Sequence, residues 1–302
     1  MIRLTIRQMQ YFDALAQTLH FGRAAALAGV SQPALSSQIA EMEERLACKL
    51  FNRGGKLVRM TDEAQALQPR IERILGEIRD VESIARRGRL AMEGRFRLGI
   101  IPTVAPYLLP QLLPELKSRF PALLLELREA VTASLVEETA SGRIDGFVAA
   151  LPLDFPGLVT EELFPDRFFL AVPAGDPGFA SPPVPPESPA LERLMLLEEG
   201  HCLREQALAL CGSVKPGAMA NYGATSLTTL LQMAAHGLGI TLIPEMAARP
   251  AGVIPDLKIV PFAEPMPSRT ICLAWRRNSP RHHECLELAR IIRDLRGVLM
   301  AA

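Results

Sequence analysis

The 302-residue sequence predicts an all-α N-terminal module, a long connecting helix, and a larger α/β domain with two lobes. Three observations predict this organisation. Apolar residues recur at helical spacing through residues 7–46, with short turns between the runs. Over residues 62–90 the apolar positions alternate at spacings of four and three, which is typical of a coiled-coil seam. From residue 95 onward apolar strands alternate with helices, so we place the three parts at 4–61, 62–92 and 95–302.

The composition limits the classes to which the chain can belong. Hydrophobic residues make up 49% and charged residues 22%, as in ordinary soluble globular proteins. The formal net charge is zero, but residues 1–60 hold eight Lys or Arg residues against four acids, which favours nucleic acid as their partner. No signal peptide, membrane-spanning run or zinc-type Cys/His spacing is evident. We therefore expect a cytoplasmic protein with no membrane contact, no metal and no cofactor.

The N-terminal module has the pattern of a helix-turn-helix unit. We expect helices at 7–18, 21–28 and 31–46, with a Gly-containing turn before the third. Ser31 is a good N-cap, and Pro33 is tolerated because it lies in the first turn. In a helix-turn-helix unit the second helix of such a pair enters the DNA major groove. A small three-helix bundle with a solvated polar face fits these residues equally well.

The third helix and the segment after it carry the candidate DNA contacts. Short polar side chains at a helix start can reach base edges, and basic side chains suit phosphates. The candidates at the helix start are Ser31, Gln32, Pro33, Ser36, Ser37 and Gln38, and those for phosphate are Arg53, Lys56 and Arg59.

Thr61 can cap the long helix over 62–90. The apolar seam of this helix is formed by Leu67, Ile71, Ile74, Ile78, Val81 and Ala85. Such a helix can pack on its own domain or on the same helix of a second subunit. Because charged residues lie elsewhere on the helix and no second apolar face is evident, we expect dimerisation.

The rest of the chain alternates between strands and helices. We expect strands near 96–101, 123–129 and 146–150 and helices over 107–120 and 134–141, in a mainly parallel sheet. Further along we expect an irregular Pro-rich loop over 173–189, strands at 194–197 and 270–275, and a closing helix over 280–296. Lobe I would comprise about 95–163 and 269–302, and lobe II about 164–268. Ligands bind such sheets in the cleft at the strand carboxyl ends.

Residues 202–211 are a candidate redox switch. The residues between Cys202 and Cys211 are mostly good helix formers, and Gly212 stands where a helix would end. Nine residues of helix would separate the two cysteine Cα atoms by about 13 Å, whereas a disulfide needs about 4.4–6.8 Å. The thiols could then bond only if the helix unwound. A helix N-terminus with Arg204 nearby favours the nucleophilic thiolate, but two small buried hydrophobes are an equally good interpretation.

Motifs of the N-terminal module resemble those of LysR-type transcriptional regulators. The matching stretches are Phe21-Gly22-Arg23-Ala24-Ala25, Val30-Ser31-Gln32-Pro33-Ala34-Leu35-Ser36 and Leu50-Phe51-Asn52-Arg53. The resemblance implies a winged helix-turn-helix domain with its wing at about 49–61, a linker helix that dimerises, and a periplasmic-binding-protein-like sensor domain. The wing tip departs from the family, because Gly54-Gly55 replaces a more usual polar or basic residue. We expect weaker phosphate contacts there.

Along nearly its whole length the chain further resembles the hydrogen-peroxide sensors of that family, the OxyR group. The stretches are Ile101-Pro102-Thr103-Val104-Ala105-Pro106-Tyr107, Glu129-Ala130-Val131-Thr132 and Gly200-His201-Cys202-Leu203-Arg204, followed by Cys211. The resemblance implies that Cys202 is the peroxidatic thiol and Cys211 the resolving thiol of a reversible disulfide. It implies that Thr103 and Thr132 hold peroxide, and that the side chains that polarise the pocket are His201, Arg204 and Arg269. No role is implied for Cys48, Cys272 and Cys285, which we expect to be structural.

The same resemblance implies a regulator of oxidative-stress genes in a bacterial cytoplasm. Its partners would be double-stranded promoter DNA, other copies of the chain in a homodimer or homotetramer, RNA polymerase, and a glutaredoxin or thioredoxin system that re-reduces it. One alternative is a LysR-type regulator that answers to a small carboxylate bound at the helix start of Thr225 and Ser226. Another is a thiol peroxidase. The DNA-binding module argues against that alternative, so we predict that the chain is not an enzyme.

Overall fold

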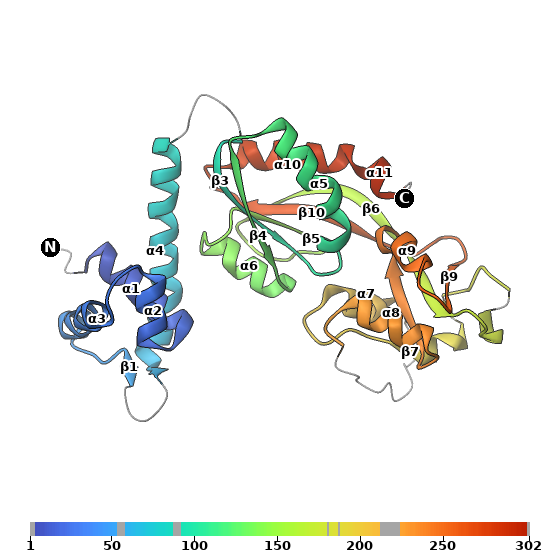
Figure 1. The fold of residues 1–302 in the computed structure, drawn as a ribbon, viewed down its shortest axis with the longest axis horizontal. Helices are drawn as coiled ribbons and strands as arrows, with labels where there is room; N and C mark the ends of the chain where they lie inside the picture. The colour runs from blue at the N-terminus through green and yellow to red at the C-terminus, as the bar shows by residue number, and fades with distance from the viewer. Residues whose placement is uncertain are drawn as a thin grey trace. The chain divides into compact units, whose positions relative to one another are not determined.

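The computed structural model describes residues 4–52, 58–86, 92–179, 181–186, 188–211 and 224–300. The chain divides into two compact units, shown in Figure 1. The N-terminal unit is Met1–Arg87 with Ala140–Arg143, and the C-terminal unit is Gly88–Thr139 with Ile144–Ala302. Each unit has its own hydrophobic core, and we describe each by itself.

Three helices and a two-stranded wing form the start of the N-terminal unit. The helices are α1 (Ile6–Thr18), α2 (Phe21–Leu27) and α3 (Gln32–Leu46). Each begins at a side-chain cap, and at α3 the Ser31 hydroxyl accepts a hydrogen bond from the Ala34 N–H, as predicted. The wing pairs β1 (Phe51–Asn52) with β2 (Arg59–Met60) in antiparallel register. The predicted helix-turn-helix arrangement with a wing is therefore present.

A buried carboxylate ties the wing to α3. Glu43 is 3% exposed and accepts hydrogen bonds from the backbone N–H groups of Leu50 (2.9 Å) and Phe51 (3.2 Å) and from Lys49 Nζ (3.0 Å). Burial alone would raise the pKa of Glu43, but these donors together hold that pKa below its ordinary value. Removal of this carboxylate would leave two backbone donors at the base of the wing without their acceptor.

The long helix α4 (Asp62–Arg86) begins where Thr61 accepts a hydrogen bond from the Ala64 N–H (3.2 Å). One edge of its apolar stripe is buried and the other is exposed. Ile71 and Leu75 are buried in the core of the N-terminal unit, with Leu67 and Ile78 packed beside them. The other edge of the stripe is exposed, with Ile74 at 42%, Val81 at 66% and Ile84 at 56%. Packing on the helix's own domain therefore uses one edge of the predicted seam, and the other edge is left for another surface.

The first half of the C-terminal unit follows the predicted alternation. The elements are β3 (Gly94–Ile100), α5 (Ala105–Arg119), β4 (Leu123–Glu129), α6 (Thr132–Ala140) and β5 (Gly146–Ala150). Strands β3, β4 and β5 are parallel, with β3 in the middle. Position 99 on β3 requires a glycine, because a Cβ there would lie 2.7–2.9 Å from the side chains of Leu135 on α6 and of Ile144 and Phe147 around the start of β5.

The second half contains two long strands that cross between the lobes. They are β6 (Leu158–Pro173) and β10 (Ser268–Arg276), which run antiparallel. Around them lie β7 (Leu194–Met195), α7 (Cys202–Cys211), α8 (Leu227–Ala235), β8 (Ile240–Pro244), α9 (Glu245–Gly252), β9 (Leu257–Pro261), α10 (His282–Asp294) and α11 (Arg296–Met300). Two short 3₁₀ helices, Pro177–Phe179 and Pro189–Arg193, lie in the predicted Pro-rich loop region or directly after it.

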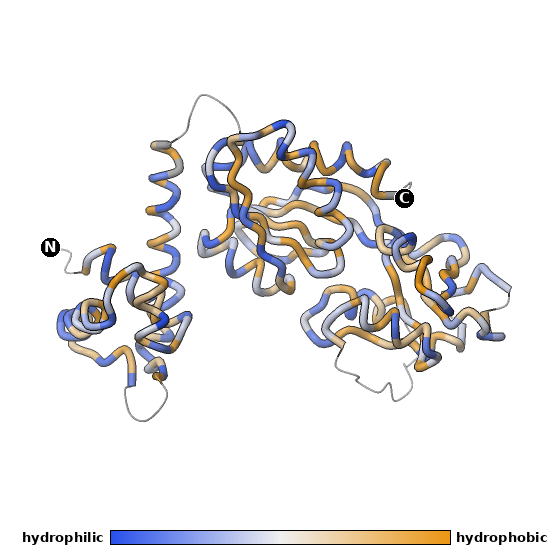
Figure 2. Tube along the Cα trace, in the orientation of Figure 1, coloured by the Kyte–Doolittle hydropathy of each residue, from blue (hydrophilic) through white to orange (hydrophobic). Residues whose placement is uncertain are grey.

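The eight-stranded sheet has the order β4-β3-β5-β10-β6-β8-β7, with β9 also paired to β6. The expectation of a mainly parallel sheet is wrong, because β6 pairs antiparallel with β8, β9 and β10, and β10 pairs antiparallel with β5. The reason is that the chain crosses between the lobes in both directions on neighbouring strands. Along β6 the core changes between Phe164, which packs in lobe I, and Phe168, which packs in lobe II. Figure 2 shows hydrophobic residues along the strands of this unit.

Candidate functional site

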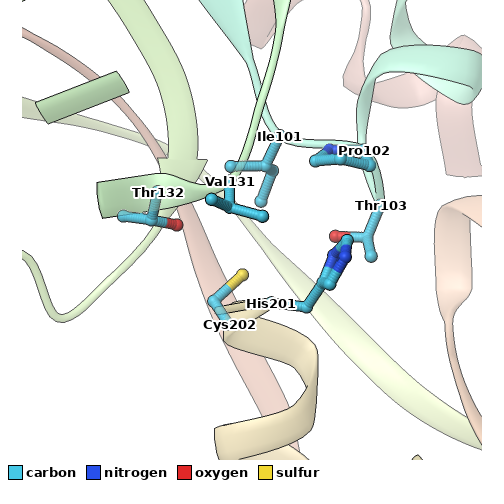
Figure 3. A pocket seen from close by; sticks show the side chains of 7 residues that line it. All are labelled: Ile101, Pro102, Thr103, Val131, Thr132, His201 and Cys202. Atoms are coloured by element: carbon cyan, nitrogen blue, oxygen red, sulfur yellow. The ribbon is translucent and has the colours of Figure 1, made fainter. Parts of the chain in front are cut away.

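Three segments far apart in the sequence form a narrow pocket in the C-terminal unit (Figure 3). The turn between β3 and α5 supplies Ile101, Pro102 and Thr103, the start of α6 supplies Val131 and Thr132, and the start of α7 supplies His201 and Cys202. Four of the predicted peroxide-site residues, Thr103, Thr132, His201 and Cys202, are therefore brought together. The apolar residues Ile101, Pro102 and Val131 also line the pocket, and we did not predict them as site residues.

Cys202 is the first residue of α7, directly after a turn at Gly200 with a φ of +93°. A left-handed backbone of this kind favours glycine. The Cys202 thiol is free and half-buried, packs beside the lobe I core, and points into the pocket toward Val131 (Figure 3). The predicted helix is confirmed, since α7 runs unbroken over the ten residues from Cys202 to Cys211. At about 1.5 Å of rise per residue, the two Cα atoms lie roughly 13 Å apart.

Thr132 carries a polar atom that has no partner in the part of the chain that the structure describes. Its Oγ1 is buried and makes no hydrogen bond. Thr132 and Cys202 line the same pocket (Figure 3). An unsatisfied buried hydroxyl costs about 1–3 kcal/mol of stability. The side chain is therefore poised for a small ligand that can donate or accept a hydrogen bond.

A buried ion pair fixes the orientation of Thr103. Arg269 lies opposite Asp166 in the β6–β10 register, and its Nε donates to Asp166 Oδ2 at 2.9 Å. The same guanidinium donates from Nη1 to Thr103 Oγ1 (2.9 Å) and from Nη2 to the Thr103 carbonyl oxygen (3.3 Å). Arginine has only donors, so the Thr103 hydroxyl accepts from Arg269 and its own proton is left to point elsewhere. Thr103 can therefore donate a hydrogen bond to a molecule in the pocket.

His201 is a largely buried imidazole that lines the pocket. It is 9% exposed, and burial lowers its pKa, which the nearby exposed Glu198 partly opposes. Two other cysteines are unsuited to redox chemistry. Burial raises the pKa of Cys272 to about 12, and it raises the pKa of Cys285 as well. Both thiols therefore stay protonated at neutral pH, in keeping with their predicted structural role.

Several predicted residues lie outside the pocket. Arg204 does not line it, because its Nη1 donates to the carbonyl oxygen of Leu197 (2.9 Å). Thr225 is exposed, and the Ser226 hydroxyl accepts from the Thr229 N–H and so caps α8. The proposed carboxylate site therefore has one of its two hydroxyls already occupied. The Cys211 side chain lies outside the described part of the structure.

Sequence reasoning missed Asp166. It is 0% exposed and accepts a further hydrogen bond from the Met246 N–H at 3.3 Å through Oδ1. One signal was available, because an aspartate within the apolar run of β6 needs a partner when it is buried. The partner itself could not be identified, since Arg269 is 103 residues away in the sequence.

Some of the predicted DNA-contacting side chains are exposed, and others are half-buried or hydrogen-bonded within the domain. Ser31, Gln32, Pro33 and Ser37 are exposed at the start of α3, whereas Leu35, Ile39 and Met42 on the opposite face are buried in the core. Ser36 and Gln38 are half-buried, and Gln38 Nε2 donates to Glu41 Oε2 (2.9 Å). Arg53, Lys56 and the wing tip Gly54-Gly55 lie outside the described residues. In the described ranges, no helix is long and apolar enough to span a membrane and no group of side chains is suited to a metal ion.

Comparisons with known proteins agree with the two units. The profile of the bacterial regulatory helix-turn-helix protein, lysR family, matches residues 6–65, and that of the LysR substrate binding domain matches residues 91–296. The chain is 37% identical to the DNA-binding transcriptional dual regulator OxyR of Escherichia coli over 290 residues, which is 96% of this chain and 95% of that protein. It is 35% identical over 291 residues to the hydrogen peroxide-inducible genes activator of Haemophilus influenzae, covering 96% of this chain and 97% of that protein.

Solved structures give the same result. A full-length OxyR variant from Pseudomonas aeruginosa superposes with a TM-score of 0.77 at 32% identity, covering 96% of this chain and 98% of that chain. A hydrogen-peroxide-bound OxyR variant from Corynebacterium glutamicum superposes with a TM-score of 0.66 at 30% identity, covering 100% of this chain and 97% of that chain.

Proposed function

The chain belongs to the LysR family of bacterial regulators, and we propose that it is a DNA-binding transcriptional regulator that responds to hydrogen peroxide through Cys202. The single observation that carries this proposal is one narrow pocket lined by both a half-buried thiol, Cys202, and Thr132, whose buried hydroxyl has no partner among the described residues. Hydrogen peroxide is small, uncharged, and both a donor and an acceptor at each oxygen. It matches a narrow pocket that offers a donor at Thr103 and an unsatisfied hydroxyl at Thr132.

The first chemical step is oxidation of Cys202. The thiolate sulfur attacks one peroxide oxygen, the O–O bond breaks, and the departing hydroxide takes up a proton to become water. Cys202 is left as a sulfenic acid. His201 directly precedes Cys202 and has a ring nitrogen that can accept the thiol proton at the start of the step, and burial, which lowers its pKa, makes it a weaker base than an exposed histidine. In this proposal Thr103 and Thr132 hold the peroxide, and Arg269 orients Thr103.

The second step forms the Cys202–Cys211 disulfide. The Cys211 thiol attacks the sulfenic sulfur and releases a second water. Since α7 separates the two Cα atoms by roughly 13 Å, the helix must unwind before the bond can form. Leu203 and Ala207 on this helix are buried in the lobe II core, so unwinding also repacks that core. A glutaredoxin or thioredoxin system would restore the dithiol.

The readout is binding to promoter DNA as a homo-oligomer in the bacterial cytoplasm. The exposed start of α3 would enter the major groove, and the wing would meet the phosphates. The exposed edge of α4 (Ile74, Val81 and Ile84) is suited to pairing with the same helix of a second copy. Repacking around α7 would then change how dimers associate in a tetramer, and RNA polymerase would respond to the changed complex.

Thiol mapping before and after a stoichiometric peroxide pulse tests the proposal. We expect wild-type protein to lose two thiols at Cys202 and Cys211, Cys202→Ser to lose none, and Cys211→Ser to gain one oxygen at Cys202. Cys48→Ser, in the N-terminal unit, is the matched control and should react as wild type does. Oxidation that spares Cys202 would refute the proposal. Sustained turnover of peroxide with a thioredoxin system, together with DNA binding that does not change on oxidation, would indicate a peroxidase instead of a regulator.

A further inference from the structure

We propose that Asp166 is a specificity-determining residue that keeps the peroxide pocket free of net positive charge, so that it takes an uncharged ligand and rejects small anions. This inference rests on the proposed peroxide response of Cys202. It concerns the choice of ligand, which neither the thiol chemistry nor the two threonines determines. An arginine beside a small pocket would otherwise favour a carboxylate or an inorganic anion.

The charge balance follows from the burial of the pair. The Arg269 side chain is 1% exposed and the Asp166 side chain 0% exposed, with Nε and Oδ2 2.9 Å apart. A guanidinium does not lose its proton in proteins, so the ion pair is the state that leaves no net charge buried. The exposed Glu198 carboxylate near His201 adds negative charge, and burial lowers the pKa of His201, which favours its neutral form. No uncompensated cation therefore faces the pocket from these groups.

Asp166 is held in place from a third element. Its Oδ1 accepts from the Met246 N–H in the first turn of α9 (3.3 Å). Helix α9 has no side-chain cap from its own N-cap residue, Pro244. The carboxylate of Asp166 on β6 takes that place, which also suits the positive end of the helix dipole. The Arg269 guanidinium is in turn clamped between Asp166 and Thr103 and lies over the Phe168 ring, 6.0 Å from its centroid.

Replacement of Asp166 by asparagine isolates the charge. The amide oxygen can still accept from the Met246 N–H, but the buried Arg269 cation loses its counter-ion. We expect the variant pocket to recruit a small anion as a substitute, and the anion would then compete with peroxide for the Thr103 end of the pocket. Glu161→Gln is the matched control, since it removes a carboxylate from the same strand that pairs with Arg293 at the surface.

The experiment measures the rate of Cys202 oxidation by peroxide in sodium formate and in sodium HEPES at equal ionic strength and pH. HEPES is too large for the pocket. We expect formate to slow wild-type protein and Glu161→Gln by less than about twofold, and Asp166→Asn by at least about fivefold. Formate inhibition of the wild type, or an Asp166→Asn variant that formate does not slow, would overturn the inference. A wild-type Cys202 that fails to react with peroxide at all would instead refute the proposed function.

A second variant covers the case in which Asp166→Asn does not fold. The double variant Asp166→Asn with Arg269→Gln buries no charge at this position. It should react more slowly than wild type, because Thr103 has lost its positioning donor, but formate should not slow it further. Strong formate inhibition of the double variant would show that anion affinity does not come from Arg269, and that result would overturn the inference too.

Discussion

Thr132→Val should make the reduced protein more stable and less reactive at once. Valine keeps the shape of threonine and removes the buried Oγ1, which has no hydrogen-bond partner among the described residues. An unsatisfied buried hydroxyl costs about 1–3 kcal/mol, so the free energy of unfolding should rise by up to that amount. For a domain of this size, each kcal/mol corresponds to about 2–4 °C in Tm.

The reaction with peroxide should slow in the same variant. A hydrogen bond to bound peroxide is worth about 0.5–1.5 kcal/mol, which corresponds to a factor of about 2–13 in the rate of sulfenic acid formation. Stopped-flow oxidation of Cys202 and thermal unfolding of the reduced protein measure the two effects. Diamide, which does not need the peroxide position, should oxidise the variant at the wild-type rate.

Thr139→Val is the matched control on the same helix. Thr139 is 0% exposed, but its Oγ1 donates to the Leu135 carbonyl oxygen at 2.7 Å. Its replacement should lower stability by up to about 1 kcal/mol and leave the oxidation rate unchanged. A Thr132→Val variant that is less stable than wild type, or that reacts with peroxide at the wild-type rate, would show that the hydroxyl has a structural role instead.

Four further predictions follow from other parts of the structure. Glu43→Gln should lower the free energy of unfolding at pH 7 and make it less dependent on pH at acid pH. Folding lowers the pKa of Glu43, so its contribution to stability is present above the ordinary pKa of 4.5 and is lost as pH falls through the lowered pKa. If urea unfolding shows the same pH dependence at acid pH as wild type, the prediction is wrong. Gly99→Ala should cost about 1–3 kcal/mol in urea unfolding, because the new Cβ would overlap the side chains of Leu135, Ile144 and Phe147. Val81→Glu, at a position that is 66% exposed, should weaken dimerisation in sedimentation velocity without loss of helix content. An unchanged dimer would show that the exposed edge of α4 is not the dimer interface. Gln32→Ala combined with Ser36→Ala should abolish specific DNase footprints while circular dichroism stays unchanged, and a normal footprint would remove α3 from base recognition.

Local patterns predicted most elements of the fold, because their causes are local. The strands at 123–129 and 146–150 have the predicted bounds, since short apolar runs between turn signals define them. The start of α3 was equally clear, because Ser31 and Pro33 are both signals of a helix N-terminus. The direction of the central strands was not predictable in this way. It depends on β10 returning beside β6, which is a property of the chain path and not of either segment.

In the site, too, features with local causes were predictable and features that join distant segments were not. Cys202 and Thr103 are visible in the sequence as motif residues, and the structure brings them to one pocket. The partner of Arg269 was not visible, because the strand register that places Asp166 opposite it joins distant segments. The family resemblance implies a place in the pocket for Arg204. Its long side chain instead reaches back to the Leu197 carbonyl oxygen, a choice that only the backbone path can reveal.

The length of β6 restricts how a signal can leave the pocket. This strand continues for sixteen residues through both lobes, paired first with β10 and then with β8 and β9. At about 3.3 Å per residue it is a continuous rod of roughly 50 Å. A bulge at Ile271/Cys272 bends the ladder without ending the pairing. Closing the lobes would strain this ladder. Unwinding α7 instead breaks the hydrogen bonds of one ten-residue helix and repacks the lobe II core around it, and β6 stays paired. Oxidation is therefore expected to act by local refolding on a stiff frame, with the two lobes keeping their mutual orientation.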